Sequence, residues 1–409
     1  MSGATMESLG LRETHLKFPT QNNRVINQDP DTVRANALST QIIMHWRYPE
    51  LVNDFLAHKR QYGTSLEKAL YHKDWTWNDQ VRRLIEKRPL VFYTDEDVTI
   101  MRDGSRRDHT FWDNIGREGR DFDVLEESLT YDEIMLGSLL GVSGRSGFIN
   151  SGSRRNRAQL GKPGEYETNG IIVGLVGARF ERPGLMDSMF IEGKGDQNPE
   201  RVQFRNMFMK FFDTEKTSTA RFDGKTYVAR MRITAEMLLL EANERAKQVG
   251  KKAYVHIVGL GLGVWQIDRA QVRLFVEAFY SAMFFLSASL KNIGTLDFSW
   301  VSPDPRGDAD WPYRDVDSDT LPSLDMKIKF SKRDPAAKLT GDEADQLLVV
   351  SYAWDGNAFP GNEYWAGSLD ASGDPAAACM SNIAELHNPL INPGFLERQT
   401  VLTPEQSSL

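Results

Sequence analysis

Short apolar runs of strand length recur along the second half of the chain, and longer stretches with helical periodicity separate them. The clearest runs are GIIVGLVGARF (170–180), KAYVHIVG (252–259) and LLVVSYA (347–353). The last run has the β-branched content of a buried parallel strand. Helical patterns cover TAEMLLLEANERAKQV (234–249) and DRAQVRLFVEAFYSAMFFL (268–286). Strands and helices that alternate in this way predict an α/β fold, with a mixed sheet between layers of helices.

The predicted helix over residues 234–249 carries capping signals at both ends. Thr234 has a hydroxyl that can accept a hydrogen bond at an N-cap, and Gly250 stands where a C′ residue belongs. We therefore expect this helix to begin at Thr234 and to end just before Gly250.

The N-terminal part of the chain has a different pattern from the rest. Residues 31–143 show helical periodicity and predict an α-helical N-terminal region. Residues 1–30 and 397–409 are polar and rich in turn formers, which predicts two flexible tails. Residues 144–396 predict the α/β domain itself. An Asp/Pro-rich insertion interrupts that domain between Ser302 and Asp325.

Charge and cysteine content exclude several classes of protein. A formal net charge of −8 disfavours a general nucleic-acid binder or a binder of anionic membranes. No apolar run is long enough to cross a bilayer, and the single cysteine, Cys379, cannot form an internal disulfide. The polar N-terminus lacks the apolar core of a signal peptide. These features predict a cytoplasmic protein, or one of the host cytosol if it is an exported bacterial effector.

No motif for a metal ion stands out in the sequence. His45, His58 and His72 lack neighbouring carboxylates or cysteines at ligand spacing. Residues 315–326 begin like a calcium loop, but Thr320 occupies the position of the required glycine. We therefore expect neither a metal nor another cofactor.

The run LLVVSYA leads into a loop crowded with polar groups, glycines and prolines. Its carboxylates and amides are Asp355, Asn357, Asn362, Glu363, Asp370 and Asp374. Four large rings are interleaved with them, Trp354, Phe359, Tyr364 and Trp365. The alternative reading, a freely solvated surface loop, has little use for such rings. The sequence therefore predicts an active-site loop.

Asp374 also has a structural reading. It can cap a helix over residues 374–386, in which Pro375 would occupy the first position. We leave the cap and the catalytic role of Asp374 open at this point.

The run KAYVHIVG ends in the alternating glycines Gly259, Gly261 and Gly263. Backbone N–H groups of such a loop can approach a ligand closely, and a position before a helix suits phosphate. The dinucleotide fingerprint G-x-G-x-x-G would need glycine in place of Val264, so a nicotinamide dehydrogenase is disfavoured. A basic, glycine-rich segment over 144–167 is either a solvated connection or a flap over phosphate.

Two segments carry a resemblance to a known family. SYAWDGNAFPGNEYW (351–365), together with GLGLGVWQ (259–266), resembles the macrodomain-like ADP-ribose hydrolases of the MavL type. The resemblance extends from about Tyr131 to Asn392 and implies a macrodomain-like fold that removes ADP-ribose from arginine side chains of proteins. It implies ADP-ribose as the product and an ADP-ribosylated protein as the partner, with ubiquitin as one candidate. The alternative function is an ADP-ribose-binding reader without turnover.

The resemblance also implies roles for individual residues. The catalytic candidates are Asp355, Glu363 and Asp374, of which Asp355 and Glu363 would handle the water and the guanidinium. Acidic groups outnumber basic ones between Trp354 and Asp374, and this excess favours a cationic leaving group. The implied ADP-ribose contacts are Gly259, Leu260, Gly261, Leu262, Gly263, Val264, Trp265, Gln266, Asn357, Asn362, Phe148 and Asn150.

Overall fold

The structure is a computed structural model of the whole chain. It describes residues 5–93, 97–192, 198–215, 221–301, 325–370 and 372–405. The acidic segment 315–326 therefore lies almost entirely outside the described residues.

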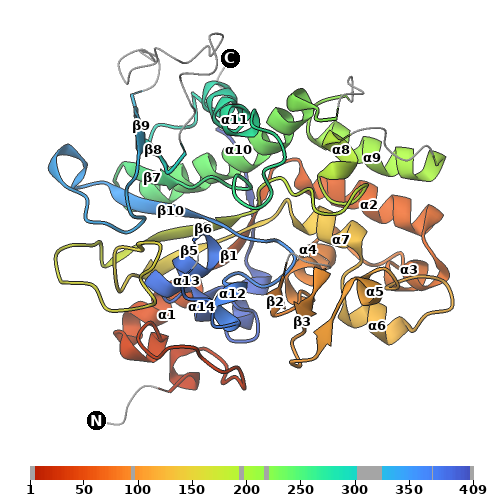
Figure 1. The fold of residues 1–409 in the computed structure, drawn as a ribbon, viewed down its shortest axis with the longest axis horizontal. Coiled ribbons are helices and arrows are strands. Elements are labelled where there is room, and N and C mark those ends of the chain that lie inside the picture. Colours follow the sequence, from red (N-terminus) through yellow and green to blue (C-terminus); the bar gives the residue numbers. More distant parts are fainter. Residues whose placement is uncertain are drawn as a thin grey trace.

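The core of the molecule is a large mixed sheet of eight strands in the order β11-β1-β5-β6-β10-β7-β8-β9 (Figure 1). Only β5 runs antiparallel to its two neighbours in this sheet. The strands are β1 (Gln41–His45), β5 (Gly141–Gly147), β6 (Asn169–Leu175), β7 (Ala253–Ile257), β8 (Ile293–Ser299), β9 (Lys327–Ser331), β10 (Leu347–Ala353) and β11 (Gln399–Leu402). The predicted α/β fold with a mixed sheet is confirmed.

Strand β10 lies between β6 and β7 and is parallel to both. Val349 is paired with Ile171 on one side and with Val255 on the other. All three side chains are almost completely buried, as expected for parallel strands that helices cover on both faces. The three apolar runs of the sequence therefore form the centre of the sheet.

Helices cover both faces of the sheet (Figure 1). The long helix α10 contacts six strands, and α11 packs beside it on the same face. Helices α1, α13 and α14 lie on the other face, and a group from α2 to α9 forms the right-hand side of the view. The helices are α1 (Pro30–Ser39), α2 (Tyr48–Tyr62), α3 (Ser65–Leu70), α4 (Trp77–Glu86), α5 (His109–Trp112), α6 (Phe122–Glu127), α7 (Tyr131–Gly137), α8 (Ser188–Ile191), α9 (Pro199–Phe211), α10 (Gly224–Gln248), α11 (Gln271–Phe285), α12 (Asn362–Trp365), α13 (Asp374–Met380) and α14 (Ile383–Leu386).

The start of α10 corrects the expectation that Thr234 is an N-cap. The helix begins ten residues earlier, at Gly224, and Asp223 caps it by accepting a hydrogen bond from the Thr226 amide at 3.1 Å. Thr234 lies inside the helix, where its hydroxyl accepts from Arg230 Nη1 at 2.8 Å. A threonine hydroxyl has local partners within a helix as well as at its end, so its presence alone does not mark a start. Gly250, with φ of +66°, follows the helix as predicted for C′.

The predicted boundary at residue 143 is wrong as a division of the fold. Strand β1 comes from within the predicted helical region, pairs with β5 and joins the main sheet. Its residues Ile42 and Ile43 are fully buried. A short apolar run does not distinguish a strand from a helix by periodicity alone, which explains the error. The remaining N-terminal region contains the helices α1, α2, α4 and α7.

The two predicted tails are also part of the packed structure. Near the N-terminus, Met6, Leu9 and Val25 are buried with residues of α14 and the segment after it. Near the C-terminus, β11 pairs in parallel with β1, with Ile43 opposite Thr400. The expectation of flexible tails over 1–30 and 397–409 is therefore wrong for the described residues 5–30 and 397–405.

A second, small antiparallel sheet lies beside the main one. It contains β2 (Val91–Phe92), β3 (Thr99–Ile100) and β4 (Arg106–Arg107).

Within the described ranges of the chain, no helix is long and apolar enough to cross a membrane.

Candidate active site

Three loops meet at the carboxyl ends of the central parallel strands. They are residues 176–187 after β6, residues 354–361 after β10 and residues 258–270 after β7. Because β10 lies between β6 and β7, these loops are neighbours, and ligands of open α/β sheets bind outside this edge. The two loops that the sequence singled out are therefore adjacent in space, although about 90 residues of chain separate them.

Two carboxylates that follow β10 in the chain are held together by one amide. Asn362 Nδ2 donates to Asp355 Oδ2 at 2.7 Å and to Asp374 Oδ2 at 2.6 Å. Asp374 also accepts hydrogen bonds from the backbone amides of Gly361 at 2.5 Å and Asn362 at 3.3 Å. Asp374 and Asn362 are buried, whereas Asp355 and Glu363 are partly exposed. Asp355 and Glu363 can therefore meet a ligand, and Asp374 with Asn362 fixes the position of Asp355.

Asp374 does not cap its own helix. It is the first residue of α13, Gly373 precedes it as the N-cap, and no side chain makes a capping hydrogen bond there. Its carboxylate instead bonds the Gly361–Asn362 backbone at the start of α12. The cap reading is thus wrong, while Pro375 does lie in the first turn as expected.

The carboxyl groups of this cluster hold protons more tightly than ordinary ones. Burial raises the pKa of Asp355 to about 6, although hydrogen bonding from Asn362 lowers it. Burial and the charge of Asp355 raise the pKa of Glu363 to about 7. Burial also raises the pKa of Asp374, and the charges of Asp355 and Glu363 add to the shift. Carboxyl groups with pKa values near neutrality are suited to proton transfer.

The sequence did not single out two charged residues of the loop after β6. Arg179 is almost completely buried, donates from Nε to Glu181 and from Nη2 to Asp97 Oδ1 at 3.3 Å, and stacks on Phe92 at 4.2 Å. Glu181 also accepts from Trp265 Nε1 at 2.5 Å. The charge of Arg179 lowers the pKa of Asp355, and that of Glu181 raises it. These two residues follow a buried strand, the same signal that identified Asp355.

A buried arginine holds the backbone of the loop after β10. Arg88 is fully buried and donates to the carbonyl oxygens of Gly356 at 2.5 Å, Gly137 at 2.9 Å and Leu84 at 2.6 Å. Its guanidinium lies 4.2 Å from the centre of the Trp354 ring, and Trp354 Nε1 donates to the carbonyl of Ala358. The rings of this loop thus form its support, which explains why they are interleaved with the polar groups.

The glycine loop combines a packed half and an open half. A Cβ at Gly261 would lie 2.9 Å from the Ala178 carbonyl oxygen, and the φ of Gly261 is +75°. By contrast, a Cβ at Gly263 would meet nothing within 4 Å, and Val264 is 85% exposed. In the described part of the chain, no acceptor bonds the amides of Gly263, Val264 and Trp265. Consecutive free amides are suited to an anion.

The structure does not bring Phe148 and Asn150 to this edge. Both follow β5, whose end is paired with Asn169 at the start of β6, so they lie at the opposite edge of the sheet. Asn150 Nδ2 donates to the Gln159 carbonyl at 2.9 Å, and its Oδ1 accepts from Gly152.

Two residues of the polar loop have different surroundings. Asp370 is exposed and pairs with Arg157 of the basic segment at 2.6 Å. Asn357 is buried, and its Oδ1 accepts no hydrogen bond from any residue that the structure describes. A buried acceptor without a partner is costly unless a ligand or water satisfies it.

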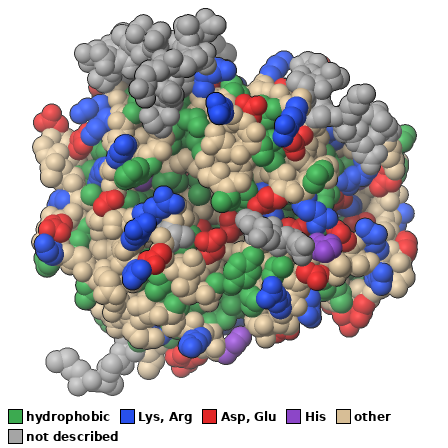
Figure 2. All heavy atoms as spheres, in the orientation of Figure 1, with side chains coloured by type: hydrophobic (Ala, Val, Ile, Leu, Met, Phe, Trp, Pro, Cys, Tyr) green, Lys and Arg blue, Asp and Glu red, His purple; other side chains and the backbone are tan. Residues whose placement is uncertain are grey.

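The face drawn in Figure 1 carries acidic side chains near its centre, with Lys and Arg side chains around them (Figure 2). Within the described segments, no group of three or more His, Cys, Asp or Glu side chains has a geometry that could hold a metal ion. The site is thus built from carboxyl groups, amides and arginines.

The chain matches known proteins over most of its length. The family model described as ADP-ribosylhydrolase MavL-like matches residues 10–207 and 197–403. A Drosophila melanogaster protein named ADP-ribosylarginine hydrolase CG3568 is 37% identical over 411 residues, which covers 90% of this chain and 78% of the relative. Another protein from the same organism, named ADP-ribosylarginine hydrolase CG2909, is 34% identical. That match covers 94% of this chain and 83% of the relative. The chain therefore belongs to the MavL-like ADP-ribosylhydrolase family.

Proposed function

We propose that this protein hydrolyses the N-glycosidic bond between ADP-ribose and an arginine side chain of a modified protein, releasing free ADP-ribose. The observation that carries the proposal is the cluster of Asp355, Glu363 and Asp374 at the carboxyl edge of the sheet, where burial raises the pKa of all three carboxyl groups. The names of the two Drosophila relatives point to the same reaction.

The reaction replaces a bond from the ribose C1″ to a guanidinium nitrogen by a bond from C1″ to a water oxygen. The electron pair of the broken bond leaves with the guanidine, through a state with oxocarbenium character. A carboxylate accepts a proton from the attacking water. The departing guanidine is a strong base and takes a proton from a carboxyl group, so arginine leaves as its ordinary cation.

We assign the water to Asp355 and the guanidinium to Glu363 together with Asp355. Asp355 has the lower pKa of the two and is the more ionised at neutral pH, as a base must be. Both are partly exposed, whereas Asp374 is buried behind Asn362. Asp374 is thus a positioning residue that orients the Asn362 amide toward Asp355.

We further propose a macrodomain-like placement of the ligand. The free amides of Gly263, Val264 and Trp265 would receive the diphosphate, since they offer several donors at an exposed turn. The unpartnered Asn357 Oδ1 would accept a hydrogen bond from a ribose hydroxyl.

An assay with three kinds of linkage tests the function. Proteins that carry ADP-ribose on arginine, serine or glutamate are incubated with the enzyme, and released ADP-ribose is measured. Arginine-modified ubiquitin is included as one candidate carrier. We expect release from arginine alone, because a site built for a cationic partner discriminates against an uncharged linkage. Efficient release from serine, with none from arginine, would contradict the assignment.

The alternative function, a reader of ADP-ribose without turnover, is separated by the same assay. A reader would bind ADP-ribose and release none from any substrate. Raised carboxyl pKa values beside the proposed sugar position favour the hydrolase, because a reader has no use for proton transfer.

A further inference from the structure

A large cavity lies beside the candidate active site, and none of the residues assigned so far lines it. Its volume is about 820 Å³, and it is bounded by α2, α3, α5, α7, α8, α9 and the loop after β6. The part of that loop around Pro183–Leu185 lines the cavity, and the charges of Arg179 and Glu181 in the same loop act on Asp355. The loop after β6 thus contributes residues to the cavity and to the surroundings of Asp355.

A hydrogen-bonded group of side chains connects the cavity lining to the loop that bears Arg179. Tyr131, which lines the cavity, donates its hydroxyl proton to Asp97. Asp97 also accepts from Arg182 Nη1 at 2.6 Å and from Arg179 Nη2 at 3.3 Å. Arg182 in turn bonds Asp113, another lining residue, at 2.9 Å. Hydrogen bonds therefore connect the cavity lining to Arg179, whose charge acts on Asp355.

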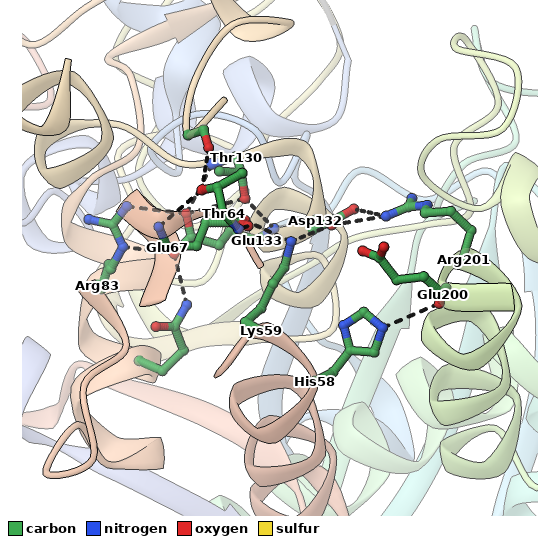
Figure 3. Close-up of polar contacts among 12 residues, drawn as sticks. His58, Lys59, Thr64, Glu67, Arg83, Thr130, Asp132, Glu133, Glu200 and Arg201 are labelled. Carbon is green, nitrogen blue, oxygen red and sulfur yellow. Dashed lines mark hydrogen bonds and ion pairs between the residues drawn. The ribbon is translucent and has the colours of Figure 1, made fainter. Parts of the chain in front are cut away.

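The carboxylates of the cavity floor are already neutralised. Lys59 Nζ lies 2.7 Å from Glu67 Oε1 and 2.7 Å from Asp132 Oδ2, and Arg201 contacts Asp132 at 3.0 Å (Figure 3). Although burial raises the pKa of Asp132, the charges of Lys59 and Arg201 lower it to about 2. These carboxylates are therefore ionised and paired, and they leave little negative charge to attract a cation.

The cavity wall instead offers donors without partners. Four arginines line it. Arg201 pairs with Asp132, whereas Arg117, Arg205 and Arg221 form no ion pair with a residue that the structure describes. Arg205 Nε and the indole Nε1 of Trp112 are buried without a hydrogen-bond partner in the same described part. Trp112 is only 4% exposed. Buried donors without acceptors are costly unless a ligand or water supplies acceptor atoms.

We propose that this cavity binds an acidic segment of the modified protein, next to the arginine that carries ADP-ribose. The inference rests on the proposed function, because it takes the neighbouring carboxylates as the place of the guanidinium. Aspartate or glutamate side chains would bond Arg205 and Arg221 through charge-assisted hydrogen bonds, and peptide carbonyls would satisfy the Trp112 indole.

Two observations favour a peptide over the nucleotide. The glycine loop already offers free amides for the diphosphate. Arg117 and Arg221 are exposed and lie on different segments of the chain, so an extended ligand can reach them from solution. An acidic catalytic cluster beside a cavity with unpaired arginines matches a modified arginine flanked by acidic residues.

The test compares two peptides that each carry one ADP-ribosylated arginine, flanked by Asp and Glu in one and by Ser and Gln in the other. Free ADP-ribosylarginine is the third substrate. In the double variant Arg205→Gln/Arg221→Gln, we expect kcat/KM to fall about 10-fold on the acidic peptide, with little change on the other two substrates. Arg145→Gln, which alters an exposed arginine of β5 outside the cavity, serves as the matched control.

A second measurement keeps the test independent of turnover. Fluorescence anisotropy with the unmodified acidic peptide should show binding to the wild type and about 10-fold weaker binding to the double variant. Failure of the wild type to cleave any arginine-linked substrate would contradict the proposed function but not this binding. Equal peptide affinity in both proteins, or a loss of free ADP-ribose affinity in the double variant, would overturn the cavity assignment.

Discussion

At the scale of single residues, the site depends on one amide that holds two carboxyl groups. Asn362 Nδ2 has two protons, and it gives one to Asp355 and one to Asp374. The side chain is fully buried, and its own Oδ1 accepts from the Phe92 amide at 3.3 Å. Every polar atom of this amide is therefore engaged, which fixes Asp355 before any substrate arrives.

The first prediction is that Asp355→Asn abolishes turnover and spares binding. The variant keeps an oxygen for the Asn362 hydrogen bond but loses the base, so kcat should fall about 100- to 10,000-fold. Calorimetry should give an ADP-ribose Kd close to that of the wild type. Asp370→Asn is the control, because Asp370 lies in the same polar loop but is exposed and pairs with Arg157. Wild-type rates in Asp355→Asn would assign the base elsewhere.

The second prediction concerns stability in the same variant. The pKa of Asp355 rises from an ordinary 3.8 to about 6 in the folded protein. Folding therefore favours the protonated form, and this contribution to stability is present below pH 3.8 and is lost as pH rises through 6. At pH 8, Asp355→Asn should unfold at a higher temperature than the wild type. Its free energy of unfolding should be higher by about 1–3 kcal/mol. The two proteins should differ less at pH 4, and an equal gain at both pH values would contradict the argument.

The third prediction is a shift of the pH–rate profile. If ionised Asp355 is the base, kcat should rise as pH increases through about 6. The charge of Glu181 helps to raise the pKa of Asp355, whereas Arg179 lowers it. Glu181→Gln should therefore move the acidic limb of the profile to lower pH. A shift to higher pH would mean that Glu181 acts on another group.

At the scale of elements, the two halves of the glycine loop have different roles. Gly261 packs against the backbone of the loop after β6 and has a left-handed backbone conformation. A residue with a side chain would be strained in this conformation even if there were room for the side chain. Gly263 has open space around its Cα. Part of the glycine pattern is thus structural, although the sequence pointed to phosphate for all three glycines.

The fourth prediction separates these roles. Gly263→Val should weaken ADP-ribose binding at least 10-fold, because its branched side chain fills the space in front of the free amides, and thermal unfolding should change little. Gly261→Val should instead lower the unfolding temperature through strain of about 1–3 kcal/mol. Calorimetry and thermal denaturation on both variants provide the test. Unchanged ADP-ribose affinity in folded Gly263→Val would remove this loop from the ligand site.

Elements that follow from local patterns could be predicted, and those that depend on distant partners could not. The central strands have branched apolar runs, and the candidate active-site loop after β10 stands out because polar groups follow such a run directly. In contrast, QIIMH (41–45) forms β1 only because β5 and β11 supply partners from elsewhere in the chain. Likewise, Arg88 supports Gly356 across 268 positions of sequence, and no local pattern indicates such a contact.

At the scale of the whole molecule, both ends of the chain complete one sheet. β1 lies between β11 and β5, so the sheet needs residues from before position 46 and after position 398. The buried cluster of the core runs from Ile42 to Leu402 without a division. The regions 31–143 and 144–396 are therefore parts of one folding unit in the described structure.

The last prediction follows from this continuity. A fragment of residues 144–396 lacks β1, β11 and most of β5's pairing, and it would expose the surfaces that Ile42, Ile43 and Leu402 cover. An unpaired edge and an uncovered apolar face favour aggregation over folding. We expect the fragment to show no cooperative thermal transition and no ADP-ribose binding, whereas residues 5–405 should behave like the full chain. A fragment that unfolds cooperatively and binds ADP-ribose with the affinity of the full chain would restore the domain boundary that the sequence pattern predicted.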